Sequence, residues 1–408
     1  MAAPGDIDRL ARDVAQDPAV VGGLLSEIAT CWRRAQISMR ELPADRPAVA
    51  HNGWMASGRR RMARLLSAPA PAVLAGITAV LVAACSTQGT PATTGTPATQ
   101  GASATQGTHV NQPAPASGPW IAPYDYLAAG GPSPAEVMKA TGLRRFTLGF
   151  VVSGGACQPV WDNGDPLTGA SEEAAIRSIR SAGGEAAVAF GGNGGTKLGL
   201  TCTSAEALAG VYQQVISAYR LRAIDLDVED AEIGSAAARQ RIIGALAIVR
   251  QRDPGLMISV TIAADSGGPD PGGQALITAA AASGLRIDAW TIMPFDFAGP
   301  GTDMAQASVQ AADGLKNDLM SAYHEPAAAA YRTMGISSMN GRTDTGELVS
   351  AADFQVILRY VMTHHLARFA FWSVNRDLPC TANSNSNTCS GIAQKPYAFT
   401  RVSVSYQG

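Results

Sequence analysis

Residues 223–230 read Ala-Ile-Asp-Leu-Asp-Val-Glu-Asp, and this stretch decides the fold class that we expect for the chain. Successive side chains of a β-strand point to opposite faces, so the aliphatic residues share one face while Asp225, Asp227 and Glu229 share the other. The apolar face suits packing under helices, and the three carboxylates then point together into the interior of a barrel. Glu229 falls at the carboxyl end of the strand, where barrel enzymes keep their active sites.

The sequence on either side of this strand repeats one arrangement. Short apolar runs alternate with helix-like stretches such as 204–219 and 236–250. Eight alternations predict an α/β fold, a single (β/α)8 TIM barrel. An open doubly wound sheet is the competing interpretation, but it would place a Gly-rich phosphate turn after the first strand, and none follows Tyr124. The predicted strands are 120–124, 145–152, 186–190, 223–228, 257–262, 289–293, 333–336 and 369–372.

The three acids suggest acid–base chemistry. Burying adjacent like charges is unfavourable and raises at least one carboxyl pKa, which is what a general acid needs. An EF-hand loop is an alternative, but it needs Gly where Asp230 stands and would not readily tolerate Leu226 and Val228. A divalent-metal site is a second alternative, weakened by the absence of nearby His, and a solvated acidic edge strand is a third. We therefore expect no metal and no cofactor.

With its neighbouring motifs, the chain resembles glycoside hydrolase family 18, the chitinases and related N-acetylglucosaminidases, over roughly Trp120 to its end. The family signature on the fourth barrel strand is Asp-x-x-Asp-x-Asp-x-Glu. Asp225, Asp227 and Glu229 match its last three acids, whereas Arg222 stands at the first. Three further segments resemble the third-strand Ser-x-Gly-Gly motif, the sixth-strand Met-x-Tyr-Asp motif and the eighth-strand Trp region of actinobacterial members: 189–192, 293–296 and 371–377.

The resemblance implies hydrolysis of β-1,4-linked N-acetylglucosamine polymers, chitin and chitooligosaccharides, by a retaining, substrate-assisted mechanism. Glu229 would protonate the glycosidic oxygen, and the substrate's own 2-acetamido oxygen would attack the anomeric carbon. Asp227 would bind the acetamido N–H and share a proton with Asp225, while Asp296 would assist at the same subsite. Glu229 would then act as a base toward water.

The resemblance also implies a set of substrate-binding residues. Trp372 would form a hydrophobic floor under the sugar, with a plain barrel-core aromatic as the alternative. Trp161 lies in a loop-like stretch rich in Gly, Pro, Asn and Asp, so we expect it to line the cleft. The remaining predicted substrate-binding residues are Phe295, Gly191, Gly192 and Met293.

Phe295 and Phe297 depart from the family pattern. Many members carry Tyr at the position of Phe295, and some bacterial members carry it after the Asp, where Phe297 stands. Its hydroxyl helps to hold the acetamido oxygen, and losing such a donor costs about 10²–10³ in turnover. We therefore predict a slow or altered enzyme, unless another group supplies the hydroxyl. The alternative functions are a catalytically weak carbohydrate-binding protein and an endo-N-acetylglucosaminidase acting on other glycans.

The composition sets broad limits on these functions. The 408 residues are 46% hydrophobic and 16% charged, which argues against wholesale disorder, and the net charge of −2 argues against nucleic-acid binding. Residues 86–118 contain no Asp, Glu, Lys, Arg, Phe, Trp or Tyr and predict a flexible spacer. We expect a monomer whose partner is an N-acetylglucosamine oligosaccharide or polysaccharide.

An export signal precedes this spacer. Residues 59–64 are rich in Arg, and the uncharged run 65–84 ends Leu-Val-Ala-Ala before Cys85. The apolar centre of the run, 72–84, is too short for a spanning helix and has the length of a signal-peptide core. Small residues before Cys85 resemble a bacterial lipoprotein box, in which the Cys is acylated; an ordinary signal peptide is the alternative. The product would lie at the extracellular face of the cell membrane or be secreted.

These segments divide the chain into four predicted parts. Translation that begins at Met55 or at Met62 would give a signal peptide with a normal-looking N-terminal region. The residues before that start can therefore be a gene-start artefact. The parts are an N-terminal extension (1–61), a lipoprotein signal peptide (62–84), a Thr/Ala/Gly/Pro linker (85–118) and the catalytic barrel (119–408).

Four cysteines remain in the exported domain: Cys157, Cys202, Cys380 and Cys389. An even count in an oxidising compartment predicts two disulfides, for which three pairings exist. Cys380 and Cys389 share one short polar loop, which favours a local bridge. Cys157 and Cys202 follow neighbouring strands and can also meet. Free buried thiols are the alternative.

Overall fold

A computed structural model describes residues 119–381 and 386–406. The chain divides into two units, Met1–Thr108 and His109–Gly408, and the described residues all belong to the second. The predicted extension, signal peptide, Cys85 and linker lie outside the described residues.

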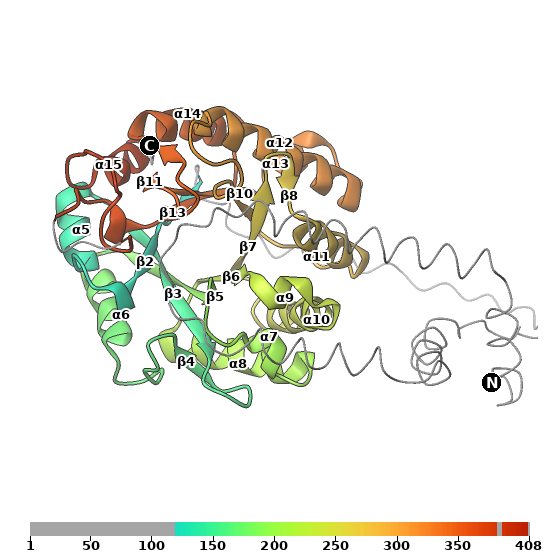
Figure 1. Ribbon diagram of the computed structural model, residues 1–408. Coiled ribbons are helices and arrows are strands. Elements are labelled where there is room, and N and C mark those ends of the chain that lie inside the picture. Colours follow the sequence, from blue (N-terminus) through green and yellow to red (C-terminus); the bar gives the residue numbers. More distant parts are fainter. Residues whose placement is uncertain (1–118, 382–385, 407–408) are drawn as a thin grey trace, which may run out of the picture. The chain divides into compact units, whose positions relative to one another are not determined.

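A curled sheet of parallel strands forms the centre of this unit (Figure 1). Its order is β1-β13-β10-β9-β7-β6-β5-β3-β2. Short strands β4 (Pro159–Trp161) and β8 (Gly268–Pro269) add to β3 and β7 in antiparallel fashion, and β11 (Gly341–Arg342) pairs with β12 (Leu348–Val349). The parallel strands are β1 (Trp120–Ile121), β2 (Tyr124–Tyr126), β3 (Arg145–Ser153), β5 (Glu185–Gly191), β6 (Ala223–Val228), β7 (Met257–Asp265), β9 (Ala289–Met293), β10 (Met334–Met339) and β13 (Arg368–Trp372).

The first strand closes the sheet. β1 pairs with β13 at one end of the order, and β2 pairs with β3 at the other. Between them, the backbone N–H of Ala122 donates to Phe369 at 3.0 Å, and the carbonyl of Pro123 accepts from Thr147 at 2.9 Å. Pro123 has no N–H to donate, so the chain changes its partner strand there. The single strand predicted over 120–124 is therefore split, and the predicted TIM-barrel class is confirmed.

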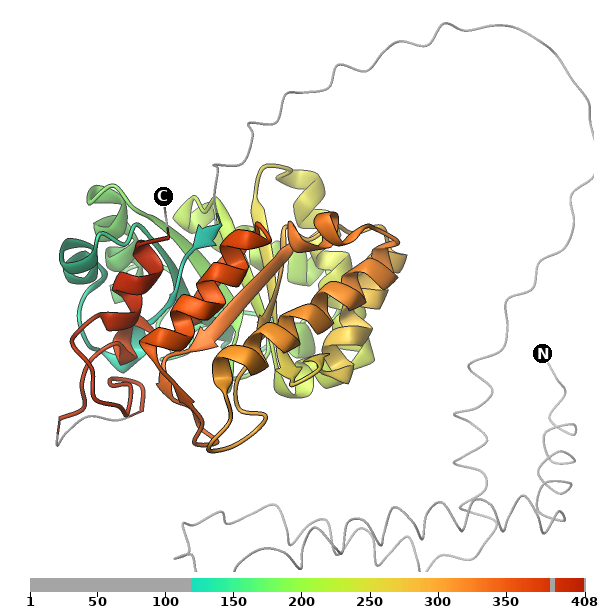
Figure 2. The same ribbon diagram turned by 90° about the horizontal axis from the view of Figure 1, so that it is seen from above.

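Helices surround the strands on the outside, as both views show (Figures 1 and 2). Ser or Asp side chains cap the starts of α5, α8, α10, α11, α12 and α14, which satisfies backbone N–H groups there. Within residues 119–381 and 386–406, no helix is long and apolar enough to cross a bilayer. The helices are α5 (Pro134–Thr141), α6 (Ser171–Ser181), α7 (Leu198–Thr201), α8 (Ala205–Tyr219), α9 (Asp230–Gly234), α10 (Ala236–Arg252), α11 (Pro271–Ala282), α12 (Met304–Tyr323), α13 (Ala327–Tyr331), α14 (Ala351–Thr363) and α15 (Ala398–Val404).

Apolar side chains fill the layer between sheet and helices. Ile224, Leu226 and Val228 of β6 belong to this outer core, as the alternation in the sequence predicts. A smaller apolar cluster, made of Tyr124, Phe150, Val152, Ala189 and Ala370, is separate from it. Buried polar residues, among them Asp225, Asp227 and Thr261, carry the chemistry described below.

Both predicted disulfides form, in the pairing that the loop positions favoured. Cys157 bonds to Cys202, closing 45 residues, and Cys380 bonds to Cys389, closing nine. Cys157 lies between β3 and β4 and Cys202 directly follows α7, so the first bridge ties two loops that leave neighbouring strands.

Loop length predicts which bridge matters more for stability. Chain entropy gives about 4 kcal/mol for a 45-residue loop and about 2.5 kcal/mol for a nine-residue loop. Replacing the Cys157–Cys202 pair by two serines is therefore expected to lower the free energy of unfolding in urea by the larger amount. Equal losses from the two double variants would contradict this entropic account.

Candidate active site

The acids of β6 alternate as the sequence predicted. Asp225 and Asp227 are both buried, at 1% and 3% exposure, although neither belongs to the apolar core. Glu229 follows the last residue of β6 and is the N-cap of α9. The side chain of Asp225 contacts groups on β2, β7 and β13, and β2 and β13 are not neighbours of β6 in the sheet, so this face points across the barrel interior.

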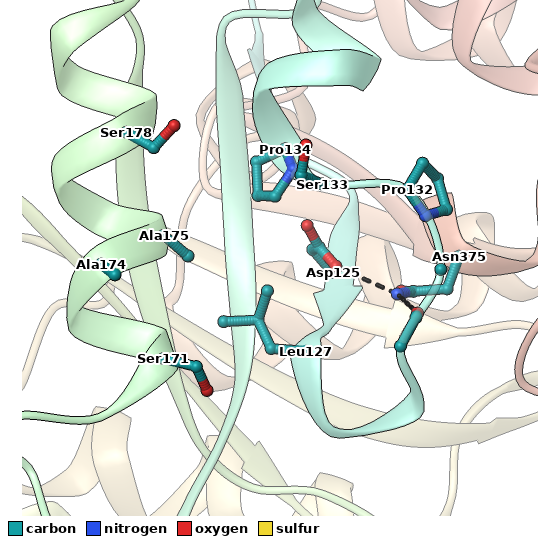
Figure 3. Close-up of a pocket in the computed structure, with 12 residues that line it drawn as sticks. Asp125, Leu127, Pro132, Ser133, Pro134, Ser171, Ala174, Ala175, Ser178 and Asn375 are labelled. Carbon is teal, nitrogen blue, oxygen red and sulfur yellow. Dashed lines mark hydrogen bonds between the residues drawn. The ribbon is translucent and has the colours of Figure 1, made fainter.

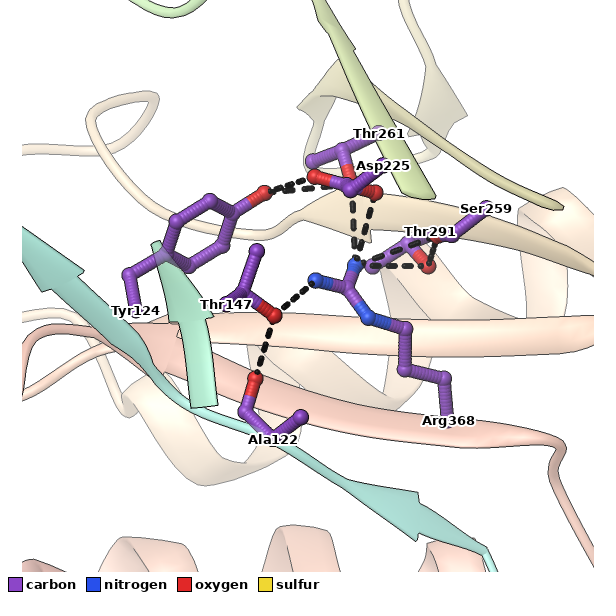
Figure 4. A network of polar contacts seen from close by, with 8 residues as sticks. All are labelled: Ala122, Tyr124, Thr147, Asp225, Ser259, Thr261, Thr291 and Arg368. Atoms are coloured by element: carbon purple, nitrogen blue, oxygen red, sulfur yellow. Dashed lines mark hydrogen bonds and ion pairs between the residues drawn. The ribbon is translucent and has the colours of Figure 1, made fainter. Parts of the chain in front are cut away.

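Asp225 lies at the centre of a buried polar network (Figure 4). Its Oδ2 accepts a hydrogen bond from the hydroxyl of Tyr124 at 2.5 Å, and its Oδ1 accepts one from Thr261 at 2.8 Å. The guanidinium of Arg368 lies 3.2 Å from Oδ1 and forms an ion pair. Asp225 is therefore held from three sides and cannot turn toward a ligand without breaking these contacts.

Arg368 is a site residue that the sequence reasoning missed. It is buried at the start of β13. The same Nη1 that faces Asp225 also donates to hydroxyls on β7 and β9, and Nη2 donates to one on β3. These acceptors lie 3.0–3.2 Å away and are Thr147, Ser259, Thr261 and Thr291. Short hydroxylated side chains here replace the branched apolar residues that usually fill a barrel.

Asp227 lies two residues further along the same face. Burial, followed by repulsion from Glu229 and Asp225, raises the pKa of Asp227 well above its usual value, while Arg368 and Lys197 act in the opposite direction. Its Oδ1 atom has no hydrogen-bond partner within the part of the chain that the structure describes. Asp227 thus offers a buried oxygen, with its protonated form favoured.

Glu229 has the electrostatics of an acid–base group. Burial raises the pKa of Glu229 to about 7; Lys197 lowers this pKa, and Asp230 and Asp296 raise it. A carboxyl group with a pKa near neutrality can release a proton and take it back at physiological pH, as general acid–base catalysis requires.

Lys197 is a second residue that the sequence reasoning missed. It follows the Gly-rich turn after β5, and it is only 3% exposed. Its ammonium group donates to the carbonyls of Gly192 and Gly194 and lies 3.4 Å from the carboxylate of Asp230. This places a buried positive charge beside the acid trio.

Gly191 and Gly192 position the trio through the backbone. Both have positive φ, 100° and 74°, which suits glycine. A Cβ atom on Gly191 would lie 2.2 Å from the carbonyl oxygen of Asp227, and one on Gly192 would lie 2.8 Å from the ring of Phe150. The N–H of Gly192 donates to the same Asp227 carbonyl at 2.9 Å. These glycines therefore let β5 end in close contact with Asp227.

Trp372 ends β13 in a group of aromatic rings. It stacks on Phe150 with the ring centroids 5.7 Å apart, and its centroid lies 5.4 Å from Tyr126 and 6.0 Å from Tyr124. Trp372 and Tyr126 are half-buried, so part of each ring remains exposed. The hydroxyl of Tyr124 bonds to Asp225, which joins this aromatic group to the acids.

The prediction that Trp161 lines the cleft is wrong. Trp161 ends β4, which folds back on β3 with Trp161 opposite Val151, and its side chain is 0% exposed. Its indole N–H donates to the hydroxyl of Tyr219 on α8 at 2.9 Å. Trp161 belongs to the outer apolar core, so the loop-like composition of its surroundings was misleading.

The segment after β9 brings Asp296 near Glu229. The carboxylate of Asp296 is already engaged in hydrogen bonds. Oδ1 of Asp296 accepts hydrogen bonds from the N–H and the hydroxyl of Thr345, at 2.9 and 3.3 Å. Buried Glu347, also missed by the sequence reasoning, accepts the backbone N–H groups of residues 296–299 at 2.7–3.1 Å. Phe295 and Phe297 are half-buried against the outer core, and Met293 is buried at the end of β9.

A separate pocket lies on the other face of β2 (Figure 3). It has a volume of about 310 Å³ and lies between α5, α6 and the loop that precedes α5. Burial raises the pKa of Asp125 in this pocket to about 7, and Asp125 accepts a hydrogen bond from Asn375 at 3.1 Å. None of the predicted catalytic acids lines the pocket, so it does not enter the assignment of the site.

The described residues contain no group of three or more His, Cys, Asp or Glu side chains arranged to hold a metal ion. The acid trio of β6 is instead accompanied by the side chains of Arg368 and Lys197, two buried cations.

Comparison with known proteins gives consistent relatives. No family model matches the chain. It is 25% identical over 304 residues to a probable bifunctional chitinase/lysozyme of Escherichia coli (strain K12), which covers 69% of this chain and 34% of that protein. It is 24% identical over 290 residues to Endochitinase 11 of Metarhizium anisopliae, and the match covers 65% of this chain and 54% of that protein. The chain therefore spans about a third and about half of the length of these relatives.

Solved structures agree with this similarity. The catalytic domain of a hyperthermophilic chitinase from Pyrococcus furiosus is 27% identical with a TM-score of 0.64, covering 71% of this chain and 94% of that one. A catalytic-site mutant of active domain 2 of the Pyrococcus furiosus chitinase, complexed with chito-oligosaccharides, gives 27% identity, a TM-score of 0.63 and the same coverage. In its barrel fold and over most of its described length, the chain is thus similar to chitinases.

Proposed function

We propose that the barrel hydrolyses β-1,4-linked N-acetylglucosamine polymers, chitin and chitooligosaccharides, by a retaining, substrate-assisted route. The observation that carries this proposal is the acid trio of β6, because its last member, Glu229, leaves the strand at the carboxyl end of the barrel with a pKa of about 7. The chitinase relatives support chitin hydrolysis in general terms.

In the proposed reaction, Glu229 gives its proton to the glycosidic oxygen as the bond to the anomeric carbon breaks. The oxygen of the substrate's 2-acetamido group forms the new bond to that carbon. Asp227 accepts the acetamido N–H on its otherwise unpartnered Oδ1, which helps to hold the acetamido oxygen at the anomeric carbon. Water then attacks the anomeric carbon as the bond from that carbon to the acetamido oxygen breaks, which restores the acetamido group, and Glu229 takes the proton from that water.

The geometry around Asp225 changes the role that the sequence suggested for it. Sharing a proton with Asp227 was the prediction, but Asp225 is ion-paired with Arg368 and receives hydrogen bonds from Tyr124 and Thr261. We propose instead that Asp225 is a fixed negative charge below Asp227. Its repulsion helps to raise the pKa of Asp227.

The sugar would lie on the aromatic group at the end of β13. A flat pyranose face stacks well on an indole, and the Trp372 ring is held by contacts with both Phe150 and Tyr126. Asp296 would assist through its effect on Glu229, whose pKa it raises.

A catalytically weak carbohydrate-binding protein is the second candidate, and one observation favours it. Phe295 and Phe297 carry no hydroxyl, and the phenols nearest to Trp372 are both engaged. Tyr124 donates to Asp225, and Tyr126 bonds to Asp162, with burial raising the pKa of Tyr126 to about 12. The acetamido oxygen would then lack a donor that is worth about 10²–10³ in rate.

Chromogenic dimers and trimers of N-acetylglucosamine test the proposal directly. We expect chromophore release from them and none from the matched glucosamine oligomers, because only the acetylated sugars carry the internal nucleophile. Binding of the acetylated oligomers without release would favour the second candidate. Equal release from both series would contradict the substrate-assisted mechanism.

The rate of hydrolysis is expected to depend on pH through Glu229. As the general acid it must be protonated at the start of the reaction, so kcat is expected to fall as the pH rises through about 7. A series of kcat measurements from about pH 5 to about pH 9 checks this. A rate that stays constant over that range would show that Glu229 is not the acid.

We further propose that Cys85 carries a lipid anchor, with residues 85–118 as a spacer that holds a monomeric barrel at the extracellular face of the membrane. The support is the Arg-rich cluster, the short apolar run and the small residues before Cys85. Lipid on a mature N-terminal Cys85, detected by mass spectrometry of the membrane fraction, would agree with this arrangement.

A further inference from the structure

Lys197 connects two loops at the catalytic end of the barrel. Its ammonium group donates to the carbonyls of Gly192 and Gly194, in the loop after β5, and lies 3.4 Å from Oδ2 of Asp230, the residue after Glu229. The N–H of Gly194 also donates to this carboxylate, at 3.3 Å. The loop after β5 is thereby joined to the first residue beyond Glu229.

The burial of Lys197 calls for a reason beyond loop structure. A lysine that is 97% buried loses most of its hydration, and it loses the side-chain freedom that an exposed lysine keeps. A neutral donor could bond the two carbonyls at lower desolvation cost. What only a cation supplies is a positive charge, and this charge lowers the pKa of buried Asp227 and of half-buried Glu229.

We propose that Lys197 is a positioning residue that holds the loop beside Glu229 and supplies the charge against which Glu229 changes between its protonated and ionised forms. This inference rests on the proposed function, since it concerns the same acid. Without Lys197, half-buried Glu229 would retain its proton too strongly to release it to the glycosidic oxygen.

The charged groups that face Glu229 fix the sign of each expected effect. Burial raises the pKa of Glu229, Lys197 from the loop after β5 lowers it, and Asp230 at the start of α9 and Asp296 after β9 raise it. Glu229 in turn raises the pKa of Asp227 on β6. Removing Lys197 must therefore move the ionisation of Glu229 to higher pH, and removing the charge of Asp230 must move it to lower pH.

Two variants with opposite expected shifts test the inference. In Lys197→Met, the ionisation of Glu229 and the alkaline limb of the kcat profile are expected to move up by about one pH unit or more. In Asp230→Asn, both are expected to move down by about half a unit, because Gly192 and Gly194 still hold the ammonium group in place. Lys139→Met, at an exposed position of α5, is the matched control. It is expected to change neither the ionisation of Glu229 nor the alkaline limb of the kcat profile.

The readout is the carboxyl ¹³C titration of Glu229 in the full chain, assigned by its loss in Glu229→Gln, together with the pH profile of kcat. The titration does not require turnover, so opposite shifts in an inactive protein would sustain this inference while the proposed function failed. Shifts of the same sign, or none, in the two variants would overturn it. If Lys197→Met does not fold, Asp230→Asn still tests the inference. An upward shift, or no shift, in the ionisation of Glu229 in that variant would overturn the inference.

Discussion

Replacing Glu229 by Gln is expected to reduce the rate of chitooligosaccharide hydrolysis about 10²–10⁴-fold, the usual contribution of a general acid. Gln keeps the size and the hydrogen-bonding shape of the side chain but has no proton to give to the glycosidic oxygen. KM is expected to change little, because the proposed sugar contacts lie on Trp372 and Asp227. Initial rates with the chromogenic trimer, against substrate concentration, separate the two parameters.

Glu232→Gln is the matched control for this prediction. Glu232 lies on α9, three residues after Glu229, and burial raises its pKa to about 6, so it is the rival candidate for the acid. Its Oε1 accepts the N–H of Gly199 at 2.7 Å, a hydrogen bond that Gln can also accept. We therefore expect Glu232→Gln to retain its rate within a few-fold. If Glu232→Gln lost its hydrolysis rate while Glu229→Gln kept full activity, Glu232 rather than Glu229 would be the general acid.

The sequence alone predicted the barrel and the position of the acids because both depend on local periodicity. The strands predicted over 223–228 and 289–293 match β6 and β9 in both bounds. The period of two within β6 separates its acids from Ile224, Leu226 and Val228, and the structure follows this division.

The partners of the acids could not be predicted in the same way, because they come from distant parts of the chain. Lys197 follows a Gly-rich turn, a setting in which lysines are usually exposed. Arg368 left a usable signal. It lies four residues before Trp372 on one strand, so the alternation that points Trp372 toward the site also points Arg368 into the barrel.

Trp161 shows the converse error. Its neighbours Asp162, Asn163 and Gly164 are typical of an exposed turn, yet the turn begins only after Trp161 has paired with Val151. Composition averaged over the stretch predicted the loop correctly but could not show that its first residue lies in the core.

The interior charges follow a simple order along the barrel axis. Arg368 at the start of β13 pairs with Asp225, Asp227 lies two residues further along β6, and Glu229 directly follows that strand. Asp225 is held in an ion pair with Arg368, whereas Glu229 has a pKa near neutrality, so each carboxyl group has a different environment. Different environments give neighbouring acids different roles.

Arg368→Met is expected to destabilise the protein by about 3–5 kcal/mol, the cost of removing one partner of a buried ion pair. Methionine fills much of the same space, so the loss would come from the carboxylate of Asp225, left without its cation, and from the hydroxyl of Thr147, which loses its donor. Chemical denaturation measures the change. Arg177→Met is the matched control, since its ion pair with Glu173 lies on the surface and is worth about 0.3–0.5 kcal/mol.

The double variant Arg368→Met with Asp225→Asn decides whether charge is the cause. If the ion pair is what Arg368 contributes, neutralising Asp225 removes the orphaned charge, and part of the lost stability should return. If Arg368 acts mainly by filling the barrel and donating to hydroxyls, the double variant should be no more stable than Arg368→Met. The same pair of variants bears on the site, because Asp225 helps to raise the pKa of Asp227. Recovery of stability without recovery of the hydrolysis rate would therefore show that the negative charge of Asp225 is itself needed beneath Asp227.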